Sequence, residues 1–411
     1  MMVEGCHILP LSAETREQLE DKKREVISFL NKQVPLEKIS QRLLSEEPLR
    51  HRMAVVASEH KEAETLIEET DSFDSSNLNN KIIFAFPGQG AAGAIPLKYL
   101  RNNLKEFDFY ITTAENILNE ESISISEILS SWKHNSSVEE QLFSFVFGIG
   151  MAKQYLYDGV NPDILIGHSL GEITAAVVSE TLSFEEALIY VLKRAKLMDS
   201  IKEKGVMCAL SASEKEIEKI LARGKDLSLA AVNAHALYVI SGRKKDILKA
   251  ESEMDKLEIK HKRLKVTLAA HSSLLDPILL EIEKIGIKNI REGKYPQYSS
   301  LSGALLDINE LRESDWWSRH TRSTVSFASA LSSMEAAISP SKPIVVEFGV
   351  HRVLMSGGME TLKDSYWTGC CSMSKYHENK SPEYCYKRGY LESMSALWQY
   401  GANIKLKGLI K

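Results

Sequence analysis

The sequence is short of cysteine, of long apolar runs and of charge of one sign, and each shortage excludes a class of protein. Its 411 residues include five cysteines, an odd number with no zinc-binding spacing, which predicts free thiols in a reducing compartment and no metal site. No window has the apolar length of a membrane span. The first ten residues lack the basic segment and apolar run of a secretory signal. We therefore expect a cytoplasmic protein with no membrane partner.

The charge balance gives no reason to expect a nucleic acid as partner, because the formal net charge is only −5. Hydrophobic residues make up 44% and charged residues 26%, which is typical of a globular protein with a sizeable core. The length of the chain predicts two or three structural units.

The N-terminal segment is predicted to be mostly helical from Leu11 to about Glu69. Ser12, with Glu14 and Thr15, is expected to open a charged helix that runs toward Leu30. A short apolar run at 53–57 predicts a strand. The polar stretch 71–80 has few core residues, so a boundary between structural units is expected there.

Two buried strands are predicted to end in glycine-rich turns. The strand at 82–86 ends at Pro87-Gly88-Gln89-Gly90, and the strand at 163–166 runs into Gly167-His168-Ser169-Leu170-Gly171, which precedes a helix of small residues. A serine in such a turn projects from the chain, and the following helix supplies free amide donors. The pentapeptide by itself supports two interpretations equally, a nucleophilic serine or a structural Gly-Ser-Gly turn.

Between residues 205 and 267 the pattern changes to that of a small inserted subdomain. Its strands and helices are predicted at 207–210, 214–223, 237–240 and 245–257. The alternation of strands and helices indicates an α+β unit inserted in a larger one. The larger unit resumes from residue 268 with a segment at 272–285 and includes a buried strand at 344–348.

Several motifs resemble those of one enzyme family. Gly167-His168-Ser169-Leu170-Gly171-Glu172 looks like the nucleophile motif of malonyl and polyketide-synthase acyltransferases, and Phe86-Pro87-Gly88-Gln89-Gly90 resembles their N-terminal loop. Further segments that resemble the family lie at 232–233, 239–242, 298–303, 317–327 and 346–349. Residues 9–13 and 51–56 look like the linker that precedes such domains in modular synthases. The resemblance covers nearly the whole chain.

The resemblance implies an α/β fold in three parts. An N-terminal α/β linker domain would span residues 1–77. A hydrolase-like large subdomain, with a parallel sheet and the nucleophile elbow, would take residues 78–204 and 268–411, which include a C-terminal tail. A small ferredoxin-like α+β subdomain would be inserted at 205–267.

The resemblance also implies roles in acyl transfer. Ser169 would be the nucleophile, and His271 would be its general base. The backbone amides of Gln89 and Leu170 would form the oxyanion hole. No Asp or Glu partner is required, because the family orients its histidine through a backbone carbonyl. The alternatives are an ordinary histidine at 271, since the chain has eleven, and a purely structural turn at Gln89.

Arg194 stands where the family holds the free carboxylate of a malonyl group. The planar fork of a guanidinium suits that task, because it matches a carboxylate with two hydrogen bonds. Without the resemblance, a solvated basic helix face with Lys193 and Lys196 would be the simpler interpretation.

Other pocket residues each have a structural alternative. The resemblance places beside the substrate Leu268, Ala270, His168 and Asn233. His168, like Glu172, also suits bracing of the turn, and Asn233 suits capping. Ala270 departs from the family pattern, since malonyl-specific enzymes commonly carry Phe there, and the smaller side chain opens space beside the α-carbon of the acyl group. Ala92, where many members have Gln, is a second departure.

The implied activity moves a malonyl-type extender unit, malonyl or a small α-substituted malonyl such as aminomalonyl, onto the phosphopantetheine thiol of an acyl carrier protein in polyketide biosynthesis. The donor would be an acyl-CoA or an acyl-carrier thioester, with no bound cofactor. Docking to a synthase module is a further expectation. A free-standing enzyme, as in hybrid peptide–polyketide pathways such as colibactin, is favoured over an excised domain, because Met1-Met2 looks like a native start and residues 405–411 resemble no tag.

Three other functions stay open. A proofreading acyl-thioester hydrolase would use the same serine and histidine, but such relatives commonly lack the arginine at 194. A general G-x-S-x-G esterase is disfavoured, because its acid partner and loop motifs are missing. A non-catalytic docking scaffold is disfavoured by the intact Ser169, His271 and Gln89.

Overall fold

The computed structural model describes residues 5–75, 80–134, 136–266, 268–371 and 380–404, together with 406 and 409. The Met1-Met2 start and most of the 405–411 tail lie outside the described residues, so the expectation about the native start is not addressed. Within the described ranges, no helix is both long enough and apolar enough to cross a membrane.

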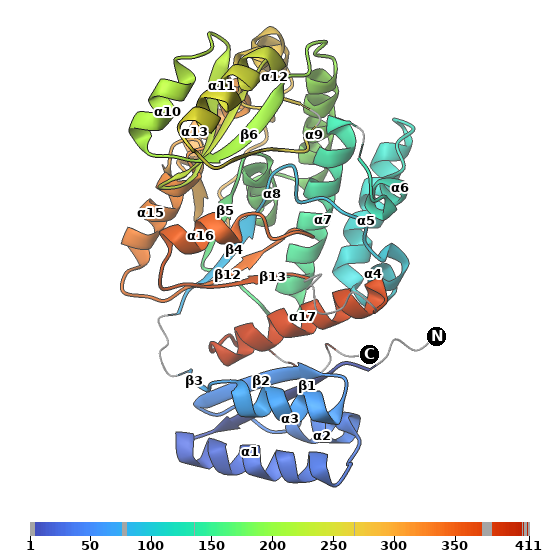
Figure 1. Ribbon diagram of the computed structural model, residues 1–411. Helices are drawn as coiled ribbons and strands as arrows, with labels where there is room; N and C mark the ends of the chain where they lie inside the picture. The colour runs from blue at the N-terminus through green and yellow to red at the C-terminus, as the bar shows by residue number, and fades with distance from the viewer. Residues whose placement is uncertain are drawn as a thin grey trace.

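The N-terminal unit is an antiparallel sheet in the order β1-β2-β3, with three helices on one face (Figure 1). Its strands are β1 (His7–Ala13), β2 (His51–Ala57) and β3 (Phe73–Asp74), and its helices are α1 (Arg16–Asn31), α2 (Leu36–Leu43) and α3 (His60–Glu69). The strand predicted at 53–57 is confirmed as part of β2.

The charged helix predicted toward Leu30 is confirmed as α1, but its predicted opening at Ser12 is wrong. Ser12 lies in β1, where it pairs with Arg52 of β2, and α1 begins only after Thr15, whose side chain forms a capping box with Gln18. The partner strand comes from far along the chain, so no local pattern reveals the pairing. The predicted polar linker at 71–80 also contains the short strand β3, and its residues 76–79 lie outside the described residues.

Helix α17 (Pro382–Gln399) fixes the N-terminal unit to the rest of the molecule (Figure 1). It covers the sheet face that the three helices leave open. Arg388 Nη1 donates to Glu62 Oε1 at 2.6 Å, and Arg52 Nη1 donates to the carbonyl oxygen of Trp398 at 3.1 Å. The C-terminal helix α17 therefore stabilises the packing of the N-terminal unit against the rest of the protein.

The large unit is built on a six-stranded sheet in the order β11-β10-β5-β4-β12-β13. The strands are β4 (Ile82–Phe86), β5 (Ile164–Gly167), β10 (Gln297–Ser299), β11 (Ala304–Leu305), β12 (Ile344–Glu347) and β13 (Tyr366–Gly369). All neighbours pair in parallel except β10 and β11. The three predicted buried strands are confirmed as β4, β5 and β12.

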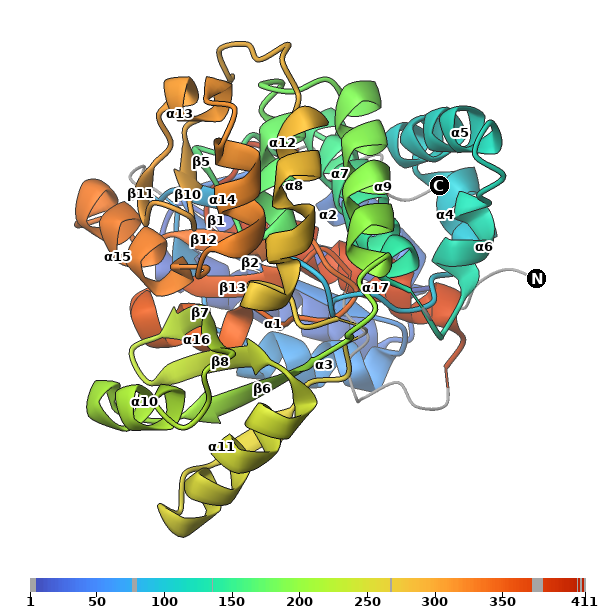
Figure 2. The same cartoon turned by 90° about the horizontal axis from the view of Figure 1, so that it is seen from above.

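Helices surround this sheet (Figures 1 and 2). Those before the inserted subdomain are α4 (Leu97–Asn103), α5 (Lys105–Asn119), α6 (Ile125–Ser130), α7 (Ser137–Tyr157), α8 (Leu170–Val178) and α9 (Phe184–Asp199). Those after it are the 3-10 helix η1 (Ser273–Ile278), α12 (Leu279–Lys284), α13 (Ile308–Arg312), α14 (Trp316–Arg322), α15 (Phe327–Ile338) and α16 (Met355–Thr361).

The inserted subdomain has a ferredoxin-like topology. Its elements follow one another as β6 (Val206–Ser211), α10 (Glu214–Leu221), β7 (Leu227–Ala234), β8 (Leu237–Gly242), α11 (Lys244–Lys256) and β9 (His261–Arg263). The strands form an antiparallel sheet in the order β7-β8-β6-β9. The predicted α+β insertion is confirmed. The sequence pattern did not predict β7, whose pairing with β8 is irregular at two places.

Buried side chains form three separate hydrophobic clusters, which belong mainly to the large unit, the N-terminal unit and the inserted subdomain. Their separation supports the predicted boundaries at 77/78, 204/205 and 267/268, which stay predictions. Thr267 lies outside the described residues. The large cluster contains stacked Phe86 and Phe348, whose ring centroids are 5.2 Å apart at the ends of β4 and β12, so this edge of the sheet is rigidly packed.

Candidate active site

Two neighbouring parallel strands bring two glycine-rich turns together at one edge of the sheet. β4 and β5 pair with Phe86 opposite Gly167, so the segments that follow them leave the sheet side by side. A Cβ at Gly171 would lie 2.0 Å from the carbonyl oxygen of Phe86, and one at Gly167 would lie 2.2 Å from the amide nitrogen of Glu172. The turn around Ser169 therefore requires glycine on both sides.

Ser169 stands at the sharpest point of this turn. Its backbone has φ 52° and ψ −119°, a conformation that costs a non-glycine residue about 1–3 kcal/mol. Its amide donates to Ser300 Oγ at 3.4 Å, and its carbonyl oxygen accepts from the amide of Glu172 at 2.8 Å and from His320 Nε2 at 3.1 Å. The surrounding structure therefore holds the strained residue from several sides.

The side chain of Ser169 faces His271. The distance from Ser169 Oγ to His271 Nε2 is 2.7 Å, and His271 Nδ1 lies 2.8 Å from the carbonyl oxygen of Ser323. Because a carbonyl can only accept, Nδ1 carries the proton and Nε2 presents its lone pair to the serine hydroxyl. A backbone carbonyl thus orients this imidazole without a carboxylate.

His271 is buried near positive charge. Burial, with the nearby charges of Arg194 and His168, lowers the pKa of His271 to about 3. The imidazole is therefore neutral across the pH range in which an ordinary histidine would titrate. Burial and Arg194 also hold the pKa of His320 well below its usual value.

Arg194 is a buried cation in α9, only 1% exposed. Its guanidinium donates to Gln141 Oε1 and, at 3.4 Å, to Thr321 Oγ1. No Asp or Glu forms an ion pair with it in the part of the chain that the structure describes. The alternative of a solvated basic face is wrong for Arg194, although its neighbours Lys193 and Lys196 are exposed.

Gln89 and Leu170 lie on the two adjacent turns. The side chain of Gln89 is occupied, because its Nε2 lies 3.3 Å from Ser137 Oγ and 3.2 Å from Glu140 Oε2. Leu170 is the first residue of α8 and is buried. Within the described ranges neither backbone amide donates to a protein acceptor, so both are available to a ligand.

The structure brings His168 and Asn233 together. His168 Nε2 lies 2.9 Å from Asn233 Oδ1, which links the turn to β7 of the inserted subdomain. Leu268 and Ala270 are buried in the segment that leads to His271. These four predicted positions therefore surround the turn and its histidine from the chain segments that the sequence indicated.

Glu172 is buried behind the turn and braces it. Its carboxyl group accepts from Ser299 Oγ at 2.7 Å and from Ser300 Oγ at 2.5 Å, both at the end of β10. Burial raises the pKa of Glu172 to about 7. This carboxyl group ties α8 to the sheet, as the bracing interpretation expected.

Five residues of the site were not predicted: Gln141, Ser300, His320, Thr321 and Ser323. Four of them lie in the segments 298–303 and 317–327 that resemble the family, so the resemblance indicated the segments and not the roles. Gln141 lies inside α7, where nothing in the local pattern distinguishes it from a core position.

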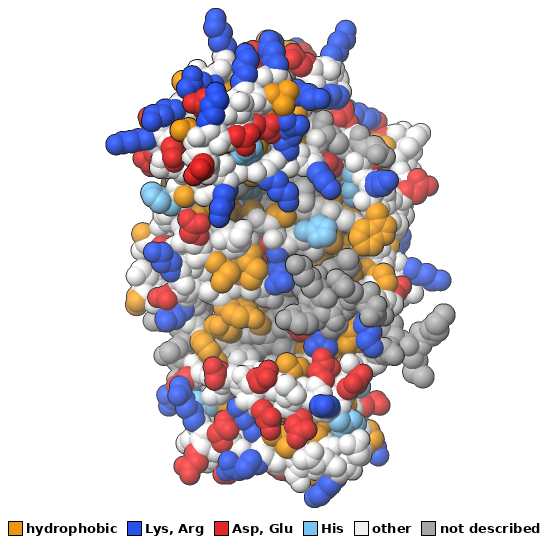
Figure 3. Space-filling view, viewed as in Figure 1, with side chains coloured by type: hydrophobic (Ala, Val, Ile, Leu, Met, Phe, Trp, Pro, Cys, Tyr) orange, Lys and Arg blue, Asp and Glu red, His pale blue; other side chains and the backbone are white. Residues whose placement is uncertain are grey.

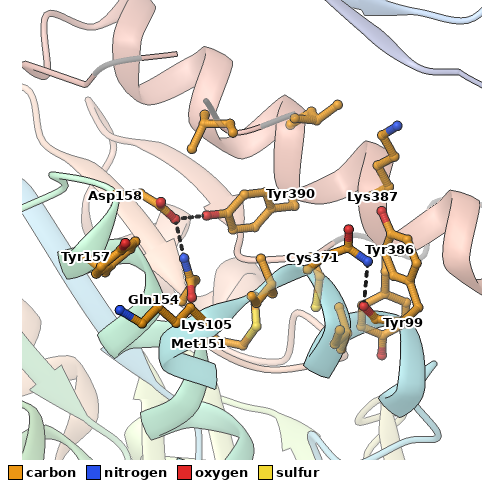
Figure 4. Close-up of a pocket in the computed structure, with 15 residues that line it drawn as sticks. Tyr99, Lys105, Met151, Gln154, Tyr157, Asp158, Cys371, Tyr386, Lys387 and Tyr390 are labelled. Carbon is orange, nitrogen blue, oxygen red and sulfur yellow. Dashed lines mark hydrogen bonds between the residues drawn. The ribbon is translucent and has the colours of Figure 1, made fainter. Parts of the chain in front are cut away.

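A separate pocket of about 230 Å³ lies between α4, α5, α7 and α17 (Figure 4). In the wall of this pocket, Tyr390 Oη and Gln154 Nε2 both donate to Asp158, and Lys105 and Lys387 also line the pocket. None of the predicted site residues lines this pocket, so it is no part of the candidate active site. Among the described residues, no group of three or more His, Cys, Asp or Glu could hold a metal ion.

A mostly parallel sheet with a ferredoxin-like insertion, and a serine held in a strained turn against a neutral imidazole, form a site suited to α/β enzymes that act through an acyl-serine. Comparison with known proteins agrees with this class. The family model described as the acyl transferase domain matches residues 83–394. The chain therefore belongs to the acyl transferase domain family.

Proteins with similar sequences include polyketide synthases. A non-reducing polyketide synthase of Pseudevernia furfuracea is 31% identical over 298 residues, which are 68% of this chain and 14% of that protein. An erythronolide synthase of Saccharopolyspora erythraea is 27% identical over 410 residues, 95% of this chain and 12% of that protein. The chain thus spans a small part of these relatives' length.

The fold agrees with a solved structure of the same class. The acyl transferase domain of SpnD, in complex with 2-(pent-4-yn-1-yl)malonyl, superposes with a TM-score of 0.86 and covers 99% of each chain at 24% identity. The agreement extends over the N-terminal unit as well as the large unit with its inserted subdomain, so the whole described fold is that of such domains.

Proposed function

We propose that the protein transfers a malonyl-type extender unit from an acyl-CoA or acyl-carrier thioester, through an acyl-serine at Ser169, to the phosphopantetheine thiol of an acyl carrier protein in polyketide biosynthesis. The observation that carries the proposal is the buried Arg194 guanidinium near the Ser169–His271 pair. Family membership supports acyl transfer, and Arg194 supports a donor with a free carboxylate.

The guanidinium argues for an anionic acyl group. A buried cation without a counter-ion costs several kcal/mol, so buried charges are normally paired. The two protein partners of Arg194, Gln141 and Thr321, are neutral, and they use only part of the five donors of the side chain. A malonyl carboxylate would satisfy the remaining donors and neutralise the charge. The malonyl ligand named for the SpnD domain is consistent with this assignment.

The first half-reaction forms the acyl-enzyme. His271 Nε2 takes the proton of Ser169 Oγ, and this oxygen attacks the carbonyl carbon of the donor thioester. The amides of Gln89 and Leu170 stabilise the negative oxygen of the tetrahedral intermediate. The carbon–sulfur bond then breaks, the donor thiol leaves with the proton held by His271, and an ester remains on Ser169.

The second half-reaction regenerates the enzyme. His271 removes the proton of the phosphopantetheine thiol, and the thiolate attacks the ester on Ser169. The same two amides stabilise the second tetrahedral intermediate. The ester bond breaks, Ser169 recovers the proton from His271, and the acyl group leaves as a new thioester. One neutral imidazole therefore serves both halves.

The small Ala270 side chain would leave space for α-substituted malonyl groups as well as malonyl itself. It is buried directly before His271, and with Leu268 it forms the segment that carries the base to Ser169. A methyl side chain there takes up less space than the phenylalanine common in malonyl-specific enzymes. Aminomalonyl is one extender unit of suitable size.

The charge distribution suits an acidic carrier protein as partner. Residues 205–266 contain 13 Lys and Arg against 9 Asp and Glu, a net charge of +4, although the whole chain carries −5. The face in Figure 3 shows basic side chains concentrated over the inserted subdomain, at the top of the view. Complementary charge would steer an acidic carrier toward this end of the molecule. Docking of this protein to a synthase module would bring the carrier protein close to the inserted subdomain.

Intact-mass measurement after incubation with a panel of acyl-CoA and acyl-carrier donors tests the proposal. We expect a malonyl-type adduct that disappears when a carrier protein with its phosphopantetheine arm is added, while the carrier gains the same mass. Loss of the adduct to water faster than to the carrier would indicate the proofreading hydrolase instead. Absence of any adduct would indicate the docking scaffold.

A further inference from the structure

His320 contacts the nucleophile through the backbone. It lies in α14, is 3% exposed, and its Nε2 is 3.1 Å from the carbonyl oxygen of Ser169. Since a carbonyl oxygen can only accept, Nε2 carries the proton and donates. The nearest carboxylate oxygen, Oε1 of Glu172, is 3.9 Å from Nε2, too far for a hydrogen bond. The ring is also fixed by stacking on Trp316, at 4.6 Å between centroids and 13° between planes.

The contacted carbonyl belongs to a particular peptide group. The carbonyl oxygen of Ser169 and the amide N–H of Leu170 are the two ends of one peptide bond. Two donors meet the oxygen end, the amide of Glu172 at 2.8 Å and His320 Nε2 at 3.1 Å. The N–H end, at Leu170, has no protein acceptor within the described ranges.

Hydrogen bonds that a carbonyl oxygen accepts polarise the whole peptide group, so its N–H becomes a stronger donor. They also fix the orientation of the peptide plane, and with it the direction of the N–H. Because Ser169 has a strained positive φ, its peptide plane is a feature that neighbouring groups must hold in place.

We propose that His320 is a positioning residue for acyl transfer, which orients and polarises the Ser169–Leu170 peptide group so that the Leu170 amide stabilises the tetrahedral oxyanion. This inference rests on the proposed function. In the proposed reaction, His320 contacts neither the acyl donor nor the reacting atoms. Among the described residues, Nδ1 of the buried ring has no hydrogen-bond partner. A buried polar atom without a partner is unfavourable, so an apolar side chain would be more stable here if the residue only filled space.

Single-turnover kinetics with three variants test the proposal. His320→Phe keeps an aromatic ring against Trp316 but removes the donor, and we expect acylation of Ser169 to slow about tenfold while the donor Kd changes less than twofold. His320→Gln supplies a side-chain N–H at similar reach and should recover most of the rate. His51→Phe is the matched control, because His51 in β2 is also buried with an unpartnered Nδ1, and it should leave both constants unchanged.

A second measurement covers the case in which His320→Phe fails to fold. Labelling Ser with ¹³C at the carbonyl and Leu with ¹⁵N selects only Ser–Leu peptide groups, which occur in this sequence at 169–170, 228–229, 273–274 and 300–301. In His320→Gln, and in His320→Phe if it folds, the 169–170 carbonyl signal should move upfield in proportion to the loss of rate. The 228–229 signal should stay in place as an internal reference.

Three results would overturn the assignment: a folded His320→Phe with acylation within twofold of the native rate, equal losses in the Phe and Gln variants, or an unmoved 169–170 signal in a slowed variant. The proposed function fails separately. If Ser169→Ala still forms the acyl-enzyme, the function is wrong; if Ser169→Ala is inactive and His320→Phe is normal, only the role of His320 is wrong.

Discussion

The turn at Ser169 and the buried cluster around Arg194, formed with Gln141 and Thr321, are built in different ways. The residue types that form the turn are local in the sequence, since the glycines at 167 and 171, Ser169 and Glu172 lie within six residues, although Ser300 and His320 also hold the turn. The cluster joins side chains from α7, α9 and α14, which are far apart in the sequence. In the proposed function, the local turn would present the nucleophile, whereas the long-range cluster around Arg194 would select the acyl group. Changes in the two regions should therefore affect rate and selectivity separately.

The largest effect on rate is expected from a substitution of His271, which faces the turn at Ser169. His271→Ala removes the base that serves both half-reactions, so acylation and transfer to the carrier should each slow by about 100- to 10,000-fold. Single-turnover rates from rapid-quench experiments measure both. His51→Ala is the control for loss of a buried histidine elsewhere. Rates within a few-fold of the native protein would show that another group is the base.

Substitutions of Arg194 should change the selectivity between acyl donors more than the rate of acyl transfer. Arg194→Met keeps much of the side-chain volume but leaves a donor carboxylate buried without its cation, which costs several kcal/mol. We expect the ratio of malonyl to acetyl transfer to fall by about 100-fold, with acetyl transfer retained or increased. Arg194→Lys should give an intermediate ratio, because it keeps the charge without the planar fork. Competition assays with paired donors measure the ratio, and an unchanged ratio in the Met variant would exclude the carboxylate role.

The pH profile connects the two regions. A base must be neutral to act, and burial with the charge of Arg194 lowers the pKa of His271 to about 3. The kcat/KM for acylation should therefore stay level as the pH falls from 7 to 5.5, where an ordinary histidine of pKa about 6.5 would already have lost about tenfold. Arg194→Met should move the acid limb to higher pH. An acid limb near pH 6.5 in the native protein would contradict the burial argument.

The smallest effect is expected at Ala270. Ala270→Phe should reduce the use of aminomalonyl or methylmalonyl donors relative to malonyl by about three- to tenfold, because the larger ring fills the space beside the α-carbon. Malonyl itself serves as the internal reference in the same competition assay. Equal losses for all donors would show that the substitution only disturbs packing next to His271.

The same contrast explains how much could be predicted from the sequence. The strands at β4, β5 and β12, the inserted α+β unit and the strand–turn–helix around Ser169 follow local patterns, and these structural predictions are confirmed. The charged helix expected toward Leu30 is confirmed as α1, but its first expected residue, Ser12, lies in β1, because the pairing of β1 with β2 depends on a segment beyond any local window. Gln141 and Thr321 beside Arg194, and His320 behind Ser169, carry no local signal, because only tertiary packing gives them their partners.

Mapping the acyl group onto the chain tests the central claim most directly. The acyl-enzyme is trapped with a malonyl-type donor, digested, and its peptides are sequenced by mass spectrometry, with Ser169→Ala treated in parallel. The account predicts the added mass on Ser169 and no adduct in the variant. Acyl mass on any other residue, or an adduct that persists in Ser169→Ala, would contradict it.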